Sequence, residues 1–249
     1  MNKWYREDLA YIHDIGFRSY ALQAMPGILA ILKQHGIQDG LIVDLGCGSG
    51  LAAEELVRVG YRVLGIDISA AMIEIARQRV PMAQFQVESL FQVEIPNCNA
   101  VIAIGECFNY LFDPESQTLT QVFQRIYNAL TPGGIFIFDI AEPGQVTNTT
   151  PIKSFTEGDD WIVLVEKQED SVQHLLTRRI ITFRQVGDYY RRDDELHALQ
   201  LYWAEEITTM LYQLGFQVET GTCYGQFALP HAHVAFVAKK PIVFLKEQV

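Results

Sequence analysis

A glycine-rich loop between a predicted strand and a predicted helix constrains the fold of this chain more than any other feature. The loop follows the apolar run Ile42–Leu45 and precedes a helical pattern over Leu51–Val59. Its glycines occupy every second position, at Gly46, Gly48 and Gly50. Glycines in such a turn let backbone N–H groups approach a ligand closely, because no Cβ blocks the way. The sequence therefore predicts a ligand-binding loop at the carboxyl end of this strand.

A carboxylate follows the next predicted strand. Asp67 stands at the end of the apolar run Val63–Ile66. A carboxylate in this position can accept hydrogen bonds from both hydroxyls of a ribose. Together, the glycine loop and Asp67 predict a nucleoside-containing cofactor that lies across the ends of two parallel strands.

The spacing of the loop separates two classes of cofactor. The dinucleotide fingerprint G-x-G-x-x-G/A would end at Leu51, which is neither Gly nor Ala. Asp44, just before the first glycine, would repel a pyrophosphate but suits a ligand with an ammonium group. S-adenosylmethionine has a ribose, an adenine, an amino-acid end and no phosphate. An NAD-dependent oxidoreductase is the alternative, and both Asp44 and Leu51 count against it.

The segment Asp44–Gly50, taken together with Asp67, resembles motifs I and II of the class I S-adenosylmethionine-dependent methyltransferases. The turn Thr131–Gly134 also resembles this family, and Tyr11–Phe17 resembles the N-terminus of its bacterial small-molecule, type 11/12-like members. The resemblance implies transfer of a methyl group from S-adenosylmethionine to a small molecule by in-line displacement. A non-catalytic module that binds S-adenosylmethionine stays open as an alternative.

The resemblance also implies a set of cofactor contacts. Backbone groups of the glycine loop would touch the methionine part, Asp44 its amino group, and Asp67 the ribose. The adenine would pack on Ile68, and its amino group would meet Ser89 or Glu88, of which strand register favours Ser89. The expected cofactor-binding residues are Asp44, Gly46, Cys47, Gly48, Asp67, Ile68, Ser89, Leu90 and Gly105.

Strand and helix patterns alternate along the first half of the chain. The predicted strands are Leu41–Leu45, Arg62–Ile66, Gln84–Glu88, Ala100–Ile104 and Ile135–Ile140, and the predicted helices are Leu51–Val59, Ser69–Arg79 and one opened by Pro114. This alternation predicts an α/β, Rossmann-like, doubly wound sheet with right-handed crossovers. The resemblance adds a closing pair, Phe216–Val218 and His233–Ala238, which makes seven strands with the last one antiparallel.

Two segments depart from this alternation. The N-terminal segment has a helical period that ends at Gly36, and it is expected to form a lid over the cofactor site. After the fifth strand come β-type runs at Trp161–Val165 and Leu175–Phe183, which predict an antiparallel insertion that covers the substrate. The expected domains are a helical lid at 1–37, a Rossmann-like domain at 38–141 with 204–249, and the insertion at 142–203.

Three side chains are candidates for acid–base chemistry, although methyl transfer needs no signature residue because the sulfonium already activates the methyl group. Glu106, after the fourth strand, could contact the cofactor or deprotonate an acceptor. His13 would line the substrate pocket, unless it is an ordinary surface or helix-end histidine. His197 shares a strand face with Glu195 and Asp193, where it could act as a general base or belong to a solvated hairpin.

Composition and charge restrict the partners and the compartment. The 249 residues include 30 acidic and 19 basic side chains, and the net charge of −11 argues against nucleic-acid binding. No apolar run could span a bilayer, and the N-terminus has no signal-peptide core. Four cysteines without paired spacing predict free thiols and a cytoplasmic location, and the pair His231 and His233 has no further ligands that would indicate metal. The acceptor atom and the oligomeric state stay open.

Overall fold

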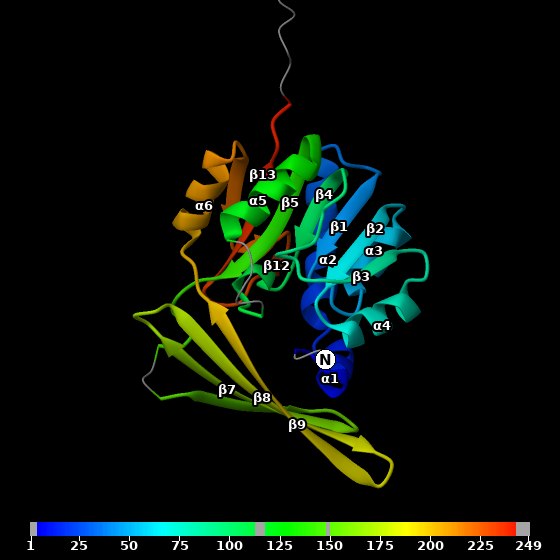
Figure 1. Cartoon of the computed structure of the whole chain (residues 1–249), viewed down its shortest axis with the longest axis vertical. Coiled ribbons are helices and arrows are strands. Elements are labelled where there is room, and N and C mark those ends of the chain that lie inside the picture. Colours follow the sequence, from blue (N-terminus) through cyan, green and yellow to red (C-terminus); the bar gives the residue numbers. More distant parts are fainter. Residues whose placement is uncertain (1–3, 113–117, 148–149, 243–249) are drawn as a thin grey trace, which may run out of the picture.

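A seven-stranded sheet forms the centre of the molecule (Figure 1). The computed structural model describes residues 4–112, 118–147 and 150–242. β13 runs antiparallel to both of its neighbours, β5 and β10, and the other pairs are parallel, which confirms the predicted Rossmann-like sheet. In spatial order the strands are β10 (Gln217–Gly221), β13 (His233–Lys239), β5 (Leu130–Ala141), β4 (Cys98–Ala103), β1 (Leu41–Leu45), β2 (Arg62–Asp67) and β3 (Gln84–Val87).

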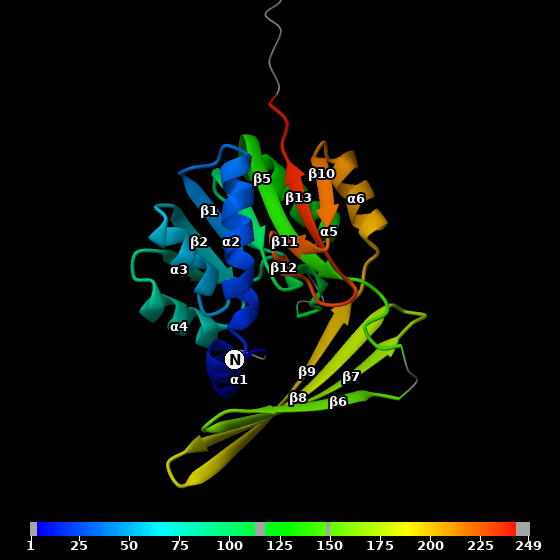
Figure 2. The ribbon, with the colours of Figure 1, turned by 180° about the vertical axis from the view of Figure 1, so that it is seen from behind.

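Alternating side chains of the central strands form two cores. In β4, Val101 and Ala103 belong to one core and Ala100 and Ile102 to the other, and all four are completely buried. Both faces are apolar because helices cover both sides of a parallel sheet. The first core includes α5 (Leu119–Ala129) and α6 (Ala204–Gln213), and the second includes α2 (Ser19–Gln34) and α3 (Leu51–Arg58) (Figure 2). The remaining helix of this domain, α4 (Ala70–Arg79), contacts β2 and β3.

Local capping signals set the starts of two helices. Ser69 caps α4 as predicted, because its hydroxyl accepts a hydrogen bond from the N–H of Met72 at 3.1 Å. α5 begins after a capping box in which Thr118 and Gln121 satisfy each other's backbone N–H groups. Pro114, which was expected to open this helix, lies outside the described residues.

The start of the fifth strand differs from the prediction. Thr131–Gly134, expected as a turn ahead of the strand, belongs to β5, which already begins at Leu130. The pairing of β4 with β5 shifts between Cys98 and Ala100, so an irregularity in the ladder accommodates the proline and the two glycines. The physical reason is that Leu130 already pairs with Cys98 of β4, ahead of the regular ladder that begins with Ala100 and Ile135.

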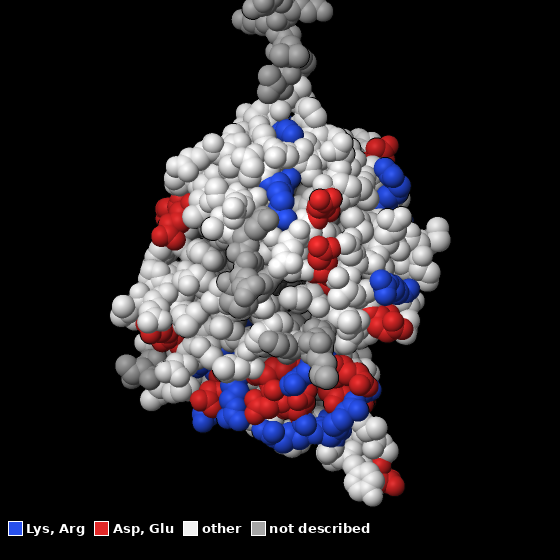
Figure 3. Space-filling model, viewed as in Figure 1, with Lys and Arg blue, Asp and Glu red and all other residues white. Residues whose placement is uncertain are grey.

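A second sheet of four antiparallel strands follows β5, and it confirms that the insertion is β-rich. Its strands are β6 (Ile152–Glu157), β7 (Trp161–Asp170), β8 (Leu175–Val186) and β9 (Tyr189–Gln200), paired in chain order. The β8–β9 hairpin turns at Gly187–Asp188, where Gly187 has φ +62°. Charged side chains of both signs gather over this sheet (Figure 3), and they include the ion pair of Arg179 with Asp194. We call these four strands the insertion sheet.

The N-terminal helix α1 (Glu7–Gly16) connects the two sheets. Asp14 near its end accepts a hydrogen bond from Ser49 in the glycine loop (2.6 Å) and pairs with Arg79 of α4 (2.7 Å). On the other side, Asp8 pairs with Arg191 of the insertion sheet at 2.5 Å. α1 thus spans the gap between the carboxyl ends of the central strands and the insertion sheet (Figure 1).

Two further features complete the fold. A short hairpin of β11 (Cys223–Tyr224) and β12 (Phe227–Ala228) packs against α2. No single helix within the described ranges is long and apolar enough to cross a bilayer, whereas α1 and α2, bent by 59°, would together meet the criteria of length and composition.

Candidate active site

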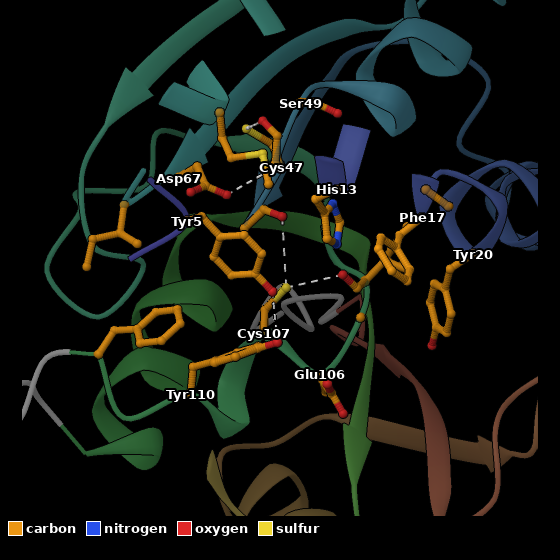
Figure 4. Close-up of a pocket in the computed structure, with 18 of the residues that line it drawn as sticks. Tyr5, His13, Phe17, Tyr20, Cys47, Ser49, Asp67, Glu106, Cys107 and Tyr110 are labelled. Carbon is orange, nitrogen blue, oxygen red and sulfur yellow. Dashed lines mark hydrogen bonds between the residues drawn. The ribbon is translucent and has the colours of Figure 1, made fainter. Parts of the chain in front are cut away.

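A cavity of about 620 Å³ lies between the carboxyl ends of the central strands, α1 and the insertion sheet. This volume is typical of small-molecule sites. Nearly all the residues singled out from the sequence line it: Asp44, Gly46, Cys47, Gly48, Asp67, Ile68, Ser89, Leu90, Gly105, Glu106 and His13. Figure 4 shows Asp67 and Cys47 at one side of the cavity, and Tyr110 and Glu106 at the opposite side.

The glycine loop leaves open space at the cavity. Gly46 and Gly48 have backbone φ angles of +76° and +53°, which residues with a side chain rarely adopt. A Cβ on Gly48 would meet no atom within 4 Å, whereas a Cβ on Gly46 would approach the Cys107 sulfur to 2.5 Å. The loop is held in place because the N–H groups of Gly46 and Cys47 both donate to the carbonyl of Ile66, at 2.7 and 3.0 Å.

Two carboxylates stand beside the loop. Asp67 accepts hydrogen bonds from Gly48 N–H (2.9 Å) and Ser69 N–H (2.8 Å), which leaves each oxygen a further lone pair. Asp44 is only 2% exposed, and its Oδ2 has no hydrogen-bond partner. Burial, followed by repulsion from Asp67, raises the pKa of Asp44 to about 7.

These groups fit S-adenosylmethionine. A buried carboxylate oxygen without a partner suits an ammonium group, and the anchored Asp67 suits ribose hydroxyls. A pyrophosphate would add negative charge beside two carboxylates, so the same residues disfavour a dinucleotide. Of the residues expected near the adenine, Ile68, Ser89 and Leu90 line the cavity, and Glu88 does not.

Asp139, at the end of β5, fixes the loop that follows β4. Its buried carboxylate accepts hydrogen bonds from the N–H groups of Gly105 (3.0 Å) and Glu106 (2.8 Å). It also accepts from the hydroxyls of Tyr20 (3.1 Å) and Tyr224 (3.0 Å). These bonds hold Glu106 at φ +55°, a conformation that is uncommon for a residue other than glycine. Asp139 was not among the residues expected from the sequence, where its only signal was an acid inside an apolar strand.

Glu106 is held by two partners rather than free. One oxygen pairs with the Arg178 guanidinium, and the other lies 2.9 Å from His233 Nε2. Burial alone would raise the pKa of Glu106, but Arg178 and His233 outweigh it and lower the pKa to about 2. The Nδ1 of His233 lies 2.9 Å from the carbonyl of His231, so a protonated ring donates from both nitrogens.

These two partners of Glu106 were not expected from the sequence. His233 was considered only with His231 as a possible metal pair, and Arg178 was not considered at all. Among the described residues there is no group of three metal-ligating side chains. No local pattern could have shown that a carboxylate after β4, an arginine in β8 and a histidine in β13 converge.

An aromatic wall faces the insertion sheet. The hydroxyls of Tyr5 and Tyr110 lie 3.1 Å apart, and the ring of Phe112 packs 4.6 Å from that of Tyr110. His13 contacts the Tyr5 ring edge-on at 5.4 Å and lines the cavity. Burial lowers the pKa of His13 to about 4, so its ring is neutral at pH 7. His13 is therefore a cavity residue and not a surface histidine.

His197 is the one candidate that the structure does not bring to the cavity. It shares a strand face with Glu195 as the alternation predicted, and its Nε2 lies 2.8 Å from Glu195 Oε2. However, its side chain is completely buried, and the rings of Tyr5 and Tyr110 pack against it. Glu195 accepts hydrogen bonds from the N–H groups of Tyr5 and Arg6, both at 2.8 Å. His197 and Glu195 therefore hold the N-terminal segment in place and do not line the cavity.

Comparisons with known proteins agree with this site. A family model described as a methyltransferase domain matches residues 42–134. A protein of Geobacillus sp. strain WCH70 that carries the name "Putative methyltransferase GWCH70_2453" is 31% identical over 84% of this chain and 88% of its own length. N-demethylindolmycin N-methyltransferase of Streptomyces griseus is 27% identical over 67% of this chain and 70% of its own length.

Solved structures share the fold. An S-adenosylmethionine-dependent methyltransferase of Clostridium acetobutylicum superposes with a TM-score of 0.79 at 21% identity, covering 93% of this chain and 97% of that one. An amino pentose methyltransferase of Micromonospora echinaspora with S-adenosylmethionine bound has a TM-score of 0.72 at 15% identity, covering 92% and 96%. This chain belongs to the S-adenosylmethionine-dependent methyltransferases: it is a methyltransferase, and S-adenosylmethionine is its cofactor.

Proposed function

We propose that this methyltransferase acts on a small-molecule acceptor that is enclosed in the cavity. The observation that carries the proposal is the coverage of the carboxyl ends of the strands by α1 and the insertion sheet. Asp8 and Asp14 tie α1 to both sides, so α1 and the insertion sheet both bound the cavity, which suits a small acceptor better than a polymer. A relative that is named for methylation of a small molecule, N-demethylindolmycin N-methyltransferase, supports the same class of acceptor.

The cofactor half of the cavity would hold S-adenosylmethionine through the residues described above. Gly46 and Gly48 offer their backbone to its methionine part, Asp44 its carboxylate to the ammonium group, and Asp67 its carboxylate to the ribose. Ile68, Ser89 and Leu90 would surround the adenine, with Cys47 and Gly105 beside the cofactor. When bound, the cofactor supplies an activated methyl group on a cationic sulfur. The cover that α1 provides would limit the access of water to that methyl group.

We infer that His13 is the side chain that accepts a hydrogen bond from the acceptor. Its ring is neutral at pH 7 and lines the cavity, so a ring nitrogen can accept a hydrogen bond from a hydroxyl or an amino group of the acceptor. Glu106 is a poor base because both of its oxygens are paired and its pKa is about 2. Glu106 instead positions Arg178 and His233.

A labelled-methyl screen tests the proposed function. The protein is incubated with S-adenosylmethionine carrying a labelled methyl group and with cell extract that has been divided by ultrafiltration. Label is expected in the low-molecular-weight fraction. Label that appears only in protein or nucleic acid would contradict a small-molecule acceptor, and cofactor binding without any transfer would contradict catalysis on these acceptors. His13→Ala should lower turnover and leave the affinity for S-adenosylhomocysteine unchanged.

A further inference from the structure

Two cations of the insertion sheet stand directly opposite each other at the cavity. Lys167 of β7 and Arg178 of β8 are cross-strand partners, and both line the cavity. Like charges in this position repel and destabilise a sheet unless an anion lies between them. An arrangement of this kind in the wall of a cavity indicates a ligand of opposite charge.

The negative charge on the protein does not balance this pair. Glu106 binds Arg178 through one oxygen and His233 through the other, so a single carboxylate faces several donors. The Arg178 Nε is buried without a hydrogen-bond partner. Within the described ranges, no hydrogen bond or ion pair engages the Lys167 ammonium group, whose pKa is lowered by burial and by Arg178. The outer face of the same sheet differs, because Lys153 there pairs with Glu166 at 3.4 Å.

The cation pair comes from a different part of the cavity wall than the carboxylates that suit the cofactor. The two carboxylates that suit the cofactor, Asp44 and Asp67, come from β1 and β2, whereas Lys167 and Arg178 come from the insertion sheet. The next cross-strand pair on the same face is apolar and also lines the cavity, and it consists of Val165 and Ile180. The aromatic rings of Tyr110 and Phe112 lie on the cavity wall as well. A cation pair beside an apolar and aromatic surface suits an amphipathic ligand with a negative charge at one end.

We propose that the acceptor is a small molecule with a carboxylate on an apolar or aromatic body, and that Lys167 and Arg178 bind this carboxylate. The proposal rests on the proposed function and names its substrate class. Two cations would withdraw charge from a carboxylate, so this group anchors the acceptor, and the atom that receives the methyl group lies elsewhere on it. Binding of the anion would relieve the repulsion between Lys167 and Arg178.

The test uses simple probes on the full-length protein saturated with S-adenosylhomocysteine. Benzoate and phenylacetate are compared with benzamide and phenylacetamide, which have the same shape without the charge, by isothermal titration calorimetry. The acids are expected to bind the wild type, and the amides about tenfold or more weakly. Lys167→Met should lower the affinity for the acids about tenfold, and Lys167→Arg should retain it. Lys153→Met on the outer face is the matched control and should behave like the wild type.

Three results would overturn the proposal. The first is equal binding of acids and amides, or binding of neither, by the wild type. The second is unchanged affinity for the acids in Lys167→Met. The third is a tenfold loss of S-adenosylhomocysteine affinity in Lys167→Met, which would assign the lysine to the cofactor's own carboxylate. None of these three results contradicts the proposed function. The proposed function fails separately if the wild type transfers no methyl group to small molecules in the labelled-methyl screen.

Discussion

The N–H group of Gly48 donates a hydrogen bond to the carboxylate of Asp67 across 2.9 Å, so the glycine loop and the end of the second strand form one rigid structure. The same carboxylate accepts from Ser69, the residue that caps α4. The cofactor site is therefore assembled by backbone groups before any ligand arrives. Such preorganisation lowers the conformational entropy that binding must overcome.

Replacement of Asp67 should weaken cofactor binding more than it weakens the fold. Asp67→Ala removes the expected acceptor for the ribose hydroxyls and the bond to Gly48. We expect the dissociation constant for S-adenosylhomocysteine to rise by about tenfold or more, because a hydrogen bond to a charged group contributes about 1.5–3 kcal/mol. Tryptophan fluorescence can follow binding, and thermal unfolding reports the fold. Glu88→Ala, a nearby acid off the cavity wall, is the control and should bind normally.

The pH dependence of the protein without ligand should reveal Asp44. Its folded pKa of about 7 lies above the ordinary value of 3.8, so ionisation destabilises the folded state. This contribution is absent below about pH 4 and grows as the pH rises to about 7. We therefore expect ligand-free Asp44→Asn to melt at a higher temperature than the wild type at pH 8, and the difference should vanish at pH 4. The two melting curves would coincide at pH 8 if Asp44 were ionised without penalty.

Cofactor affinity should also depend on the ionisation of Asp44. An ammonium group favours the carboxylate form, so binding of S-adenosylhomocysteine to the wild type should take place with release of a proton near pH 6. Calorimetry in buffers of different ionisation enthalpy measures that proton. Asp44→Asn should bind more weakly and release none, and proton release from the variant equal to that from the wild type would assign the proton to another group.

Removal of Arg178 should destabilise the protein strongly. Glu106 would remain buried with only His233 as partner, and breaking a buried ion pair in this way costs about 3–5 kcal/mol. Because the folded pKa of Glu106 is about 2, below its ordinary value of 4.5, its stabilisation is present at neutral pH and is lost as the pH falls from about 4.5 to 2. Urea unfolding at pH 7 should show a large loss for Arg178→Met. Arg179→Met, at the neighbouring exposed position, should show little change.

The ion pairs of Asp8 should control how tightly α1 covers the cavity. Asp8 is 3% exposed and binds both Arg184 (3.2 Å) and Arg191 (2.5 Å). Asp8→Ala leaves both arginines without this partner, and we expect faster amide hydrogen exchange in α1 and weaker binding of S-adenosylhomocysteine. Glu7→Ala breaks only an exposed pair with Arg191 and serves as the control. Equal exchange rates in the two variants would mean that Asp8 does not hold the lid.

The sequence was sufficient for the parts of the site that lie within single strand–loop–helix units. The glycine loop, Asp67 and the cap at Ser69 are set by neighbours a few residues apart, so their spacing already encodes their geometry. The nearly continuous apolar run of β4 likewise predicts a strand with helices on both sides. The same local logic placed His197 and Glu195 on one face of β9.

Only the tertiary structure decided which side chains meet. Glu106, Arg178 and His233 come from the loop after β4, from β8 and from β13, and Asp139 joins Tyr20 to Tyr224 across the molecule. Strand alternation gives the face of a side chain but not what covers that face, which is why His197 lies behind aromatic rings instead of at the cavity. Burial and charge then fix the protonation of Glu106 and His13, because both depend on partners and packing that are distant in the sequence.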